Sequence, residues 1–415
     1  MLQAPRGTKD IFADELYLWN EVENKIRDIF YRFNFDEIRT PIFESTDLFN
    51  RSVGENSDIA KKEMYTFLDK SGRSLTLKPE GTAPIVRSAI QNNLFLANPK
   101  LFYFTPAFRY ERPQAGRYRE FYQCGCEFFG LESSNCDAEL ISLAYEILTS
   151  LGIKNVNLKL NSIGCEKCRQ NYNSLLKKFL ADNIQNLCLD CKKRFDSNPL
   201  RILDCKNKSC KKILSVSPSI LETLCDDCKN HFNNVQTLLN DLGVPFQIDD
   251  KIVRGLDYYT KTVFEFIHDN IAICGGGRYD NLVLELGGPK ICAVGFAFGF
   301  ERLISILQAQ NLFANCKKKL DLFIASIGLK TLNKSQIIAN NLRKKNFAVE
   351  YNTIDRSIKS QIKTAAKLNA NYLIVIGENE LNSDSIKIKN MNTRVETQIE
   401  IENIDKFLAL EEKQK

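Results

Sequence analysis

Hydrophobic positions in the first 150 residues change from a helical spacing to β-type runs. Leu16, Trp19, Val22, Ile26 and Phe30 recur at intervals of three and four, which predicts an amphipathic helix. The next segments favour strands because β-branched and aromatic residues are frequent in them. They are an edge or interface strand at 36–44, interrupted by Pro41, a hairpin at 63–78 around Gly72, and two aromatic strands at 101–111 and 119–130. A second helix is predicted at 136–150.

The rest of the chain has three different patterns. Residues 164–248 form a cysteine-rich stretch that ends in a helical run. β-type sequence resumes at 251–266 and 271–283, and 291–307 predicts a strand that runs into a helix. After a lysine-rich linker near 316–319, strand and helix patterns alternate. This alternation favours a small α/β domain with a mainly parallel sheet.

Size and composition exclude several classes of protein. A chain of 415 residues is too long for one ordinary core, so two or three domains are expected. Its longest strongly apolar stretch, 293–300, is far shorter than the roughly 20 residues that span a bilayer. The first ten residues lack the apolar core of a signal peptide. We therefore expect a cytoplasmic protein without a membrane partner.

Charge and histidine content narrow the chemistry. The net charge of +6 is compatible with an RNA partner but does not by itself indicate one. His231 and His268 are the only histidines in the sequence, so catalysis by a histidine base is not expected. The 14 cysteines, in a chain without an export signal, are expected to be reduced thiols or metal ligands.

Three arginines and two glutamates occupy positions where the backbone is expected to be rigid. Arg109 ends a strand, Arg254 precedes a glycine and Arg302 opens a helix. Guanidinium groups at such positions suit a polyanion, because their planar forks bind phosphate oxygens in two places. For any one of these arginines taken alone, a solvated or ion-paired surface position is the better interpretation. Glu80 precedes a glycine in KPEGT and Glu127 has glycines on both sides in CGCEFFG; as buried carboxylates they would need cationic or N–H partners.

Several long motifs, all in the same order, resemble histidyl-tRNA synthetases. They are PRGTKDIF near the start, TLKPEGTAPIVR at 76–87, FRYERPQAGRYREFYQCGCEFFG at 108–130, VRGLDYYTKTVFEF at 253–266, GGGRYDNL at 275–282 and AVGFAFGFERL at 293–303. They match the class II motifs and the two histidine-specific motifs of that family. The segment 357–380 is similar to the family's anticodon-binding domain.

The resemblance implies an α+β fold: a class II antiparallel sheet flanked by helices, a mainly helical insert and a C-terminal α/β anticodon-binding domain. It places the catalytic core at 1–163 and 249–314, the insertion domain at 164–248 and the anticodon-binding domain at 321–415. It also implies a homodimer, with the segment around Pro41 as the interface motif.

The activity implied by the resemblance is that of a ligase, histidine–tRNA ligase. Such an enzyme attaches L-histidine to histidine tRNA through an enzyme-bound histidyl-adenylate and releases AMP and pyrophosphate. ATP with Mg²⁺, L-histidine and histidine tRNA are the implied substrates. A separate editing domain is not expected, since buried polar groups left unpaired by a wrong amino acid can supply roughly 10⁴-fold selectivity.

Site residues follow where the motifs match. Arg109, Arg254 and Arg302 resemble the catalytic arginines that contact the ATP phosphates, and Arg109, Arg302 and Glu111 form the implied ATP set. Glu127 and Tyr259 resemble the pair that brackets the imidazole of histidine. The full implied histidine-binding set is Glu80, Gly81, Thr82, Arg109, Gln123, Glu127, Arg254, Tyr258 and Tyr259.

The loop between the two aromatic strands is the implied contact with the acceptor end of the tRNA. Arg112, Gln114 and Arg119 stand at matching positions, with Gln114 as a base reader and the arginines as phosphate contacts. Solvated loop side chains are an equally good interpretation of each residue taken singly.

The resemblance does not explain four cysteine pairs in the insert. We predict a four-thiolate zinc site from Cys188, Cys191, Cys225 and Cys228, because two CxxC pairs about 35 residues apart are typical of such sites. Cys205 and Cys210 are substitutes or members of a second site, and the pair 165/168 receives less weight. Reduced, packed thiols are the alternative. Eight basic residues between 192 and 212 suit either an RNA-facing or a solvated surface.

Two other functions are compatible with parts of the sequence. Synthetase-like regulatory subunits of the first enzyme of histidine synthesis have lost aminoacylation, usually lack the anticodon-binding domain and have eroded motifs. A zinc-ribbon nucleic-acid binder would explain only the insert. The presence of 321–415 and of all three arginines favours the synthetase.

Overall fold

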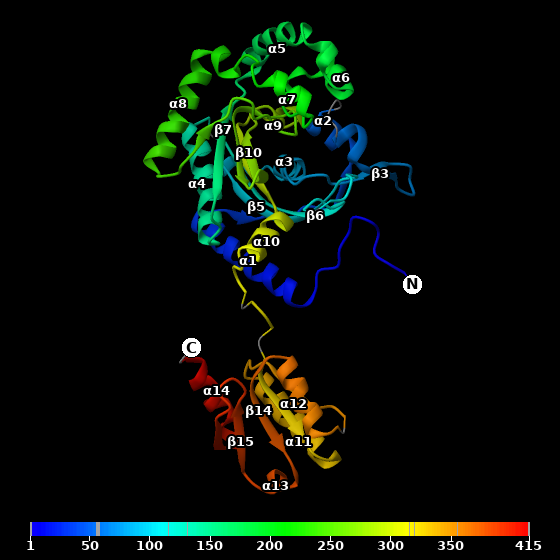
Figure 1. Cartoon of the computed structure of the whole chain (residues 1–415), viewed down its shortest axis with the longest axis vertical. Coiled ribbons are helices and arrows are strands. Elements are labelled where there is room, and N and C mark those ends of the chain that lie inside the picture. Colours follow the sequence, from blue (N-terminus) through cyan, green and yellow to red (C-terminus); the bar gives the residue numbers. More distant parts are fainter. Residues whose placement is uncertain are drawn as a thin grey trace. The chain divides into compact units, whose positions relative to one another are not determined.

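The computed structural model describes residues 2–54, 59–114, 116–130, 132–314, 316–318, 320–354 and 356–413. The chain divides into two compact units (Figure 1). The first contains residues 1–11 and 19–314, and the second contains residues 12–18 and 315–415. Within the described residues, no helix is both long enough and apolar enough to cross a membrane.

The elements up to residue 314 include the following helices and strands. The helices are α1 (Ala13–Arg32), α2 (Thr46–Val53), α3 (Thr82–Gln91), α4 (Ser134–Ser150), α5 (Glu166–Ala181), α6 (Leu189–Ser197), α7 (Lys208–Leu214), α8 (Asp226–Asp241), α9 (Leu282–Glu285) and α10 (Phe300–Ala309). The strands are β1 (Asp36–Glu37), β2 (Phe43–Ser45), β3 (Tyr65–Leu68), β4 (Ser74–Leu77), β5 (Lys100–Phe108), β6 (Glu120–Phe129), β7 (Val156–Ser162), β8 (Gln247–Ile248), β9 (Thr260–His268), β10 (Ile271–Arg278) and β11 (Ala293–Gly299).

An eight-stranded sheet with the order β1-β5-β6-β11-β10-β9-β7-β8 organises the first unit. Its six central strands pair antiparallel, and the short edge strands β1 and β8 pair parallel. Helix α1 packs beside this sheet through Trp19, whose ring meets Tyr122 of β6 and Phe300 of α10 edge-on. The predicted antiparallel sheet flanked by helices is therefore confirmed.

Two predicted strands differ from the structure. The segment 36–44 is divided near Pro41, so that β1 joins the large sheet while β2 joins a small sheet with the order β2-β4-β3. The predicted strand at 251–266 begins only at Thr260. Residues 254–259 are irregular. Side chains, instead of a neighbouring strand, bind the carbonyl groups of Arg254, Gly255 and Tyr259.

The cysteine-rich insert is mainly helical, as predicted, and contains α5 to α8 (Figure 1, green). The chain enters it after β7 and returns as β8, which pairs parallel with β7. Consequently the insert begins and ends at the same edge of the large sheet. Its four helices surround buried leucines, isoleucines and cysteines that belong to the same hydrophobic cluster as Tyr258 and Tyr259.

The second unit has an α/β architecture. Its elements are β12 (Leu320–Ser326), α11 (Leu329–Arg343), β13 (Val349–Tyr351), α12 (Ile358–Lys367), β14 (Ala370–Ile376), α13 (Glu378–Leu381), β15 (Ser385–Asn390), β16 (Glu396–Glu400) and α14 (Ile404–Lys413). Strands β13, β12 and β14 are parallel, as the sequence predicts. The hairpin of β15 and β16 extends the sheet antiparallel and was not predicted, although Ile386 and Ile388 alternate with lysines as in a half-buried strand.

Candidate active site

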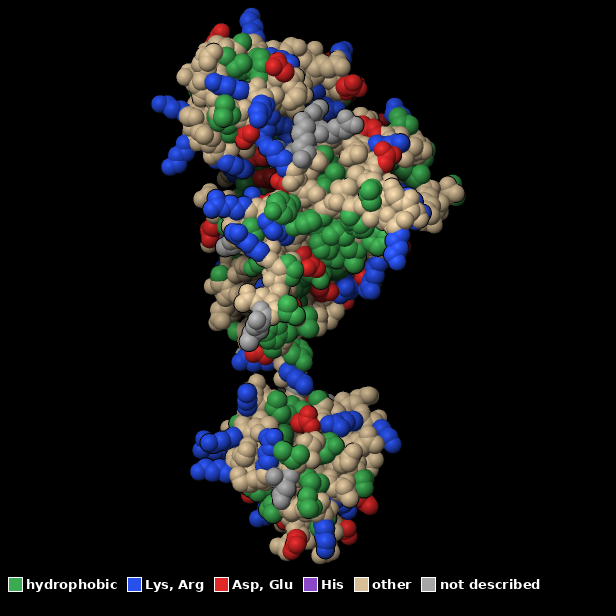
Figure 2. Space-filling view, turned by 90° about the vertical axis from the view of Figure 1, so that its right-hand side faces the viewer, with side chains coloured by type: hydrophobic (Ala, Val, Ile, Leu, Met, Phe, Trp, Pro, Cys, Tyr) green, Lys and Arg blue, Asp and Glu red, His purple; other side chains and the backbone are tan. Residues whose placement is uncertain are grey.

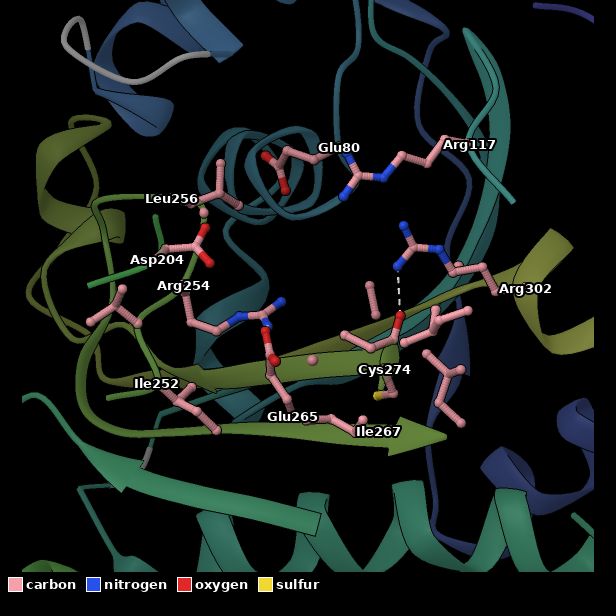
Figure 3. Close-up of a pocket in the computed structure, with 18 of the residues that line it drawn as sticks. Glu80, Arg117, Asp204, Ile252, Arg254, Leu256, Glu265, Ile267, Cys274 and Arg302 are labelled. Atoms are coloured by element: carbon pink, nitrogen blue, oxygen red, sulfur yellow. Dashed lines mark hydrogen bonds and ion pairs between the residues drawn. The ribbon is translucent and has the colours of Figure 1, made fainter. Parts of the chain in front are cut away.

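A cavity of about 1500 Å³ lies between the large sheet and the insert. Segments that are distant in the sequence line it, including the start of α3, strands β6 and β9–β11, and the segment from α6 to α7 of the insert. In Figure 3, Arg254 points into this space from one side, and Arg117 and Arg302 point into it from the other. A cavity of this size with converging charged groups is typical of a site for a polar substrate.

Glu80 lies at the start of helix α3. One carboxylate oxygen accepts from the backbone N–H of Thr82 at 2.7 Å, and the other accepts from Ala83 at 2.8 Å. These bonds satisfy two of the N–H groups that a helix start leaves unpaired. Burial raises the pKa of Glu80, and the two N–H bonds oppose this rise. Gln123 of β6 fixes the same turn, because its side-chain oxygen accepts from the N–H of Gly81 at 3.1 Å.

Glu127 of β6 is buried beneath the cavity. It accepts hydrogen bonds from the hydroxyl groups of Thr82 at 2.7 Å, Tyr103 at 3.4 Å and Tyr279. Burial raises the pKa of Glu127 to about 8. Gly295 of β11 makes room for this carboxyl group, since a Cβ atom there would lie 1.8 Å from Oε2. The result is a buried acceptor surrounded by donors.

Tyr258, Tyr259 and Tyr279 form an aromatic wall next to Glu127. The ring centroids of Tyr258 and Tyr259 are 4.6 Å apart, and Tyr258 meets Tyr279 edge-on at 5.4 Å. All three rings are buried and line the cavity. Such a wall, with a carboxyl group and phenol hydroxyls at its base, suits a flat polar ring.

Arg254 is held across the surface of the sheet. Its guanidinium group forms an ion pair with Glu265 of β9 and lies about 6.0 Å from the ring of Tyr259. Burial alone would lower the pKa of Arg254, but the ion pair with Glu265 raises it. Gly275 of β10 lies directly beneath, because a Cβ atom there would come within 2.3 Å of both terminal nitrogens of Arg254.

Arg109 and Arg302 occupy other positions on the cavity wall. Arg109 donates from Nε to the carbonyl of Pro79 at 2.8 Å and lies over the ring of Phe121. Arg302 donates from Nη1 to Ala272 at 2.6 Å and from Nε to Gly116 at 3.2 Å. Burial, together with nearby Arg117, lowers the pKa of Arg302. The three predicted arginines thus converge on one cavity from separate segments.

Only some residues of the predicted acceptor loop line the cavity. Gln114 lines the cavity. Glu111 of the predicted ATP set also lines it and forms an ion pair with Arg117 at 3.1 Å. Arg112 is exposed, and it is not among the residues that line the cavity. Arg119 likewise does not line it; its guanidinium group stacks on Tyr110.

Several residues of the site were missed by sequence reasoning. Tyr103 and Tyr279 donate to Glu127, Glu265 pairs with Arg254, and Arg117 lines the cavity. Glu265 had a usable signal, since it is a single charged residue inside the apolar run VFEFI. The two tyrosines had none, because pairing with Glu127 depends on how β5, β6 and β10 are aligned.

The predicted zinc ligand set is wrong in how it combines the cysteine pairs. Cys188 and Cys191 meet Cys205 and Cys210, whereas Cys225 and Cys228 meet Cys165 and Cys168. The reason is the packing of the helices. Cys165 precedes α5 and Cys225 precedes α8, and the starts of these two helices lie together. The lower weight given to the pair 165/168 was therefore also wrong.

Both units match known protein families. The model of the family "Histidyl-tRNA synthetase" matches residues 7–177 and 196–303, and the model "Anticodon binding domain" matches residues 321–410. A histidine–tRNA ligase of Caldanaerobacter subterraneus subsp. tengcongensis is 49% identical over 98% of this chain and 99% of the relative. One from Clostridium kluyveri is 49% identical over 99% of both chains.

A solved structure has the same fold over nearly the whole chain. The crystal structure of apo S. aureus histidyl-tRNA synthetase is 37% identical and has a TM-score of 0.84. The match covers 98% of this chain and 100% of that one. The chain belongs to the histidyl-tRNA synthetase family.

Proposed function

We propose that this protein is a histidine–tRNA ligase that activates L-histidine with ATP and transfers it to histidine tRNA. The observation that carries the proposal is the convergence of Arg109, Arg254 and Arg302 on the cavity that also contains Glu80 and Glu127. ATP, as its magnesium complex, is a substrate. The reaction belongs in the cytoplasm, together with tRNA.

Histidine binding follows from the charges at the base of the cavity. The ammonium group of the amino acid meets Glu80, Thr82 and Gln123. Glu80 offers a carboxylate and Thr82 a hydroxyl oxygen at the start of α3, and Gln123 offers an amide oxygen on β6. The imidazole ring lies along the tyrosine wall between Glu127 and Tyr259. A neutral imidazole has one donor and one acceptor nitrogen, so a carboxylate and a phenol satisfy both.

Adenylate formation needs charge stabilisation more than a protein nucleophile. A carboxylate oxygen of histidine attacks the α-phosphorus of ATP, a new P–O bond forms, and the bond to pyrophosphate breaks. Arg109 and Arg254 stabilise the negative charge on the five-coordinate phosphorus, and Arg302 holds the γ-phosphate. Because all three guanidinium groups are already anchored by carbonyl or carboxylate partners, little reorganisation is needed.

Transfer to tRNA completes the reaction. A hydroxyl group of the terminal ribose attacks the carbonyl carbon of the adenylate, and AMP leaves. The loop of Arg112, Gln114 and Arg119 contacts the acceptor end, with Gln114 on the cavity side. Residues 321–415 contact the anticodon, in agreement with the family model for that segment.

A homodimer is part of the proposal. Ile42, Phe43, Phe67 and Leu68 belong to the small sheet or its flank and have exposed fractions between 43% and 69%. Figure 2 shows a hydrophobic patch on the first unit, on the side where β3 lies in Figure 1. Exposed apolar surface of this kind on an edge strand is typical of an interface. Structural zinc in the insert is also part of the proposal.

Histidine-dependent ATP–pyrophosphate exchange tests the proposed activity, with the other amino acids as controls. Exchange with histidine alone is the expected result. A folded, dimeric sample that shows no exchange in the presence of Mg²⁺ would contradict the proposal and favour a regulatory, non-catalytic relative. Charging of histidine tRNA is the second measurement, since it requires the acceptor loop and the anticodon-binding domain as well.

A further inference from the structure

Eight cysteines of the insert form two separate groups of four. Cluster A contains Cys165, Cys168, Cys225 and Cys228, and cluster B contains Cys188, Cys191, Cys205 and Cys210. In each cluster all sulfur atoms lie within 4.8 Å of one another. Five of the eight side chains are buried and the other three are half-buried.

The sulfur spacing is that of a tetrahedral metal site. Zinc bound by four thiolates at about 2.3 Å holds its sulfur atoms about 3.8 Å apart. The distance is 3.6 Å from Cys165 to Cys168, 3.9 Å from Cys165 to Cys225 and 3.8 Å from Cys188 to Cys205. A disulfide would need about 2.05 Å, and all eight cysteines are free.

Backbone N–H groups point at the sulfur atoms of both clusters. The N–H of Cys225 donates to Cys168 at 3.1 Å, the N–H of Cys188 donates to Cys210 at 3.2 Å, and Asn207 donates to Cys205 at 3.4 Å. Such bonds stabilise thiolates, and they orient metal ligands in the way that outer-shell partners do. Packed neutral thiols would have no need of them.

The charge of the segment around cluster B also suits a zinc ion bound by four thiolates. Zinc with four thiolates has a net charge of −2, and the segment 192–212 around this cluster contains eight basic residues against Asp196 and Asp204. The sequence allowed either an RNA-facing or a solvated surface for these basic residues. A zinc site in cluster B would give them a negatively charged partner nearby.

Each cluster adjoins an arginine that holds the irregular segment 254–259. Arg169 follows Cys168 on α5, and its Nη1 donates to the carbonyl of Tyr259 at 2.9 Å. Arg201 lies in the short 3₁₀ helix Pro199–Ile202 between Cys191 and Cys205, and donates to the carbonyls of Arg254 at 2.8 Å and Gly255 at 2.6 Å. The two arginines thus bind the two ends of the segment that provides Arg254, Tyr258 and Tyr259.

We propose that clusters A and B each bind one structural zinc ion, and that these ions fix Arg169 and Arg201 where they hold the 254–259 segment in its active geometry. The metal sites stand on the cysteine geometry alone, and the effect on catalysis rests on the proposed function. A metal ion that joins both ends of the segment 188–210 restricts the position of Arg201 within it. A metal ion that joins the starts of α5 and α8 restricts the position of Arg169.

Zinc content and its ligands provide a test that does not depend on activity. Full-length protein purified without a metal-chelating tag should contain two zinc ions per chain, and X-ray absorption should show four sulfur neighbours at about 2.3 Å. Cys191→Ser and Cys228→Ser should each retain one ion, while Cys292→Ser and Cys316→Ser, outside both clusters, should retain two. A content of one or zero in the unaltered protein, iron instead of zinc, or nitrogen and oxygen ligands would overturn the proposal.

The coupling to catalysis is tested with variants that leave the metal sites intact. Arg201→Ala should keep two zinc ions but lower the kcat of histidine-dependent exchange by about 10- to 100-fold, as expected when a catalytic group is misplaced by about 1 Å. Arg201→Lys, which can still donate to one carbonyl, should recover part of the activity. Lys178→Ala removes an exposed positive charge of the same insert, outside the segment 192–212 and away from the cavity, and is the matched control.

The outcomes separate the two proposals. If the unaltered protein exchanges with histidine but Arg201→Ala has normal kcat, the coupling is wrong and the proposed function stands. If the unaltered protein binds two zinc ions without any exchange, the proposed function fails and the metal sites stand. Should the cysteine variants not fold, the zinc content and X-ray absorption of the unaltered chain still decide the metal sites.

Discussion

Glu265 holds the guanidinium group of Arg254 by an ion pair, directly over the bare backbone of Gly275. Three segments meet at this point: an irregular stretch provides the arginine, β9 provides its partner and β10 provides the space. Because the glycine has no side chain, the guanidinium group lies flat on the sheet and faces the cavity. The position of this cation in the cavity is therefore set by an absent side chain as much as by a charged one.

Replacing Arg254 by alanine should abolish most adenylate formation while sparing histidine binding. In the proposed mechanism the guanidinium group stabilises charge that develops at the phosphorus, so its removal should lower the rate of pyrophosphate exchange by about 10²- to 10³-fold. Calorimetry should find histidine affinity changed far less than the rate. Near-normal exchange in this variant would show that Arg254 has no catalytic role.

Gly275→Ala should reproduce much of this loss without touching the arginine itself. A Cβ atom at 275 would overlap the terminal atoms of Arg254, which are the mobile end of a long side chain, so the protein should fold and the guanidinium group should move. We expect exchange to fall by at least about tenfold. The control is a double-mutant cycle, because adding Gly275→Ala to Arg254→Ala should cost almost nothing more. Fully additive losses would mean that the glycine acts elsewhere.

The sequence predicted the arginines of the site better than it predicted their surroundings. Arg109, Arg254 and Arg302 lie in long recognisable motifs, and the structure brings all three to the same cavity. Gly275 and Glu265 also lie in those motifs, but their relation to Arg254 depends on strand register, which spacing along the chain does not encode. The cysteine pairs were combined wrongly because the packing of the insert helices, which brings the starts of α5 and α8 together, is not encoded in that spacing either.

Glu127→Gln should weaken selection for histidine. In the proposed complex Glu127 accepts from the imidazole N–H as a carboxylate, having released the proton that it holds in the histidine-free protein. The amide keeps the size of the side chain but has no negative charge, and its NH₂ group places a donor where the carboxylate has an acceptor, which is costly in a buried site. We expect KM for histidine in the exchange assay to rise by at least about tenfold, with a smaller change in KM for ATP. Equal changes in both KM values would contradict the assigned role.

Between pH 5.5 and pH 8, Glu127 should make the stability of the histidine-free protein fall as pH rises. Burial raises the pKa of Glu127 from 4.5 to about 8, so between these values the folded state holds a proton that the unfolded state has lost. The contribution of this proton to stability is complete below pH 4.5 and is lost as pH rises through 8, at no more than about 1.4 kcal/mol per pH unit. Glutamine cannot titrate, so the urea midpoint of Glu127→Gln should rise relative to that of the unaltered protein between pH 5.5 and pH 8. Glu301, whose pKa burial raises to about 7, titrates in both proteins and cancels in the comparison. A midpoint difference that is the same at both pH values would show that Glu127 does not bind its proton in this range.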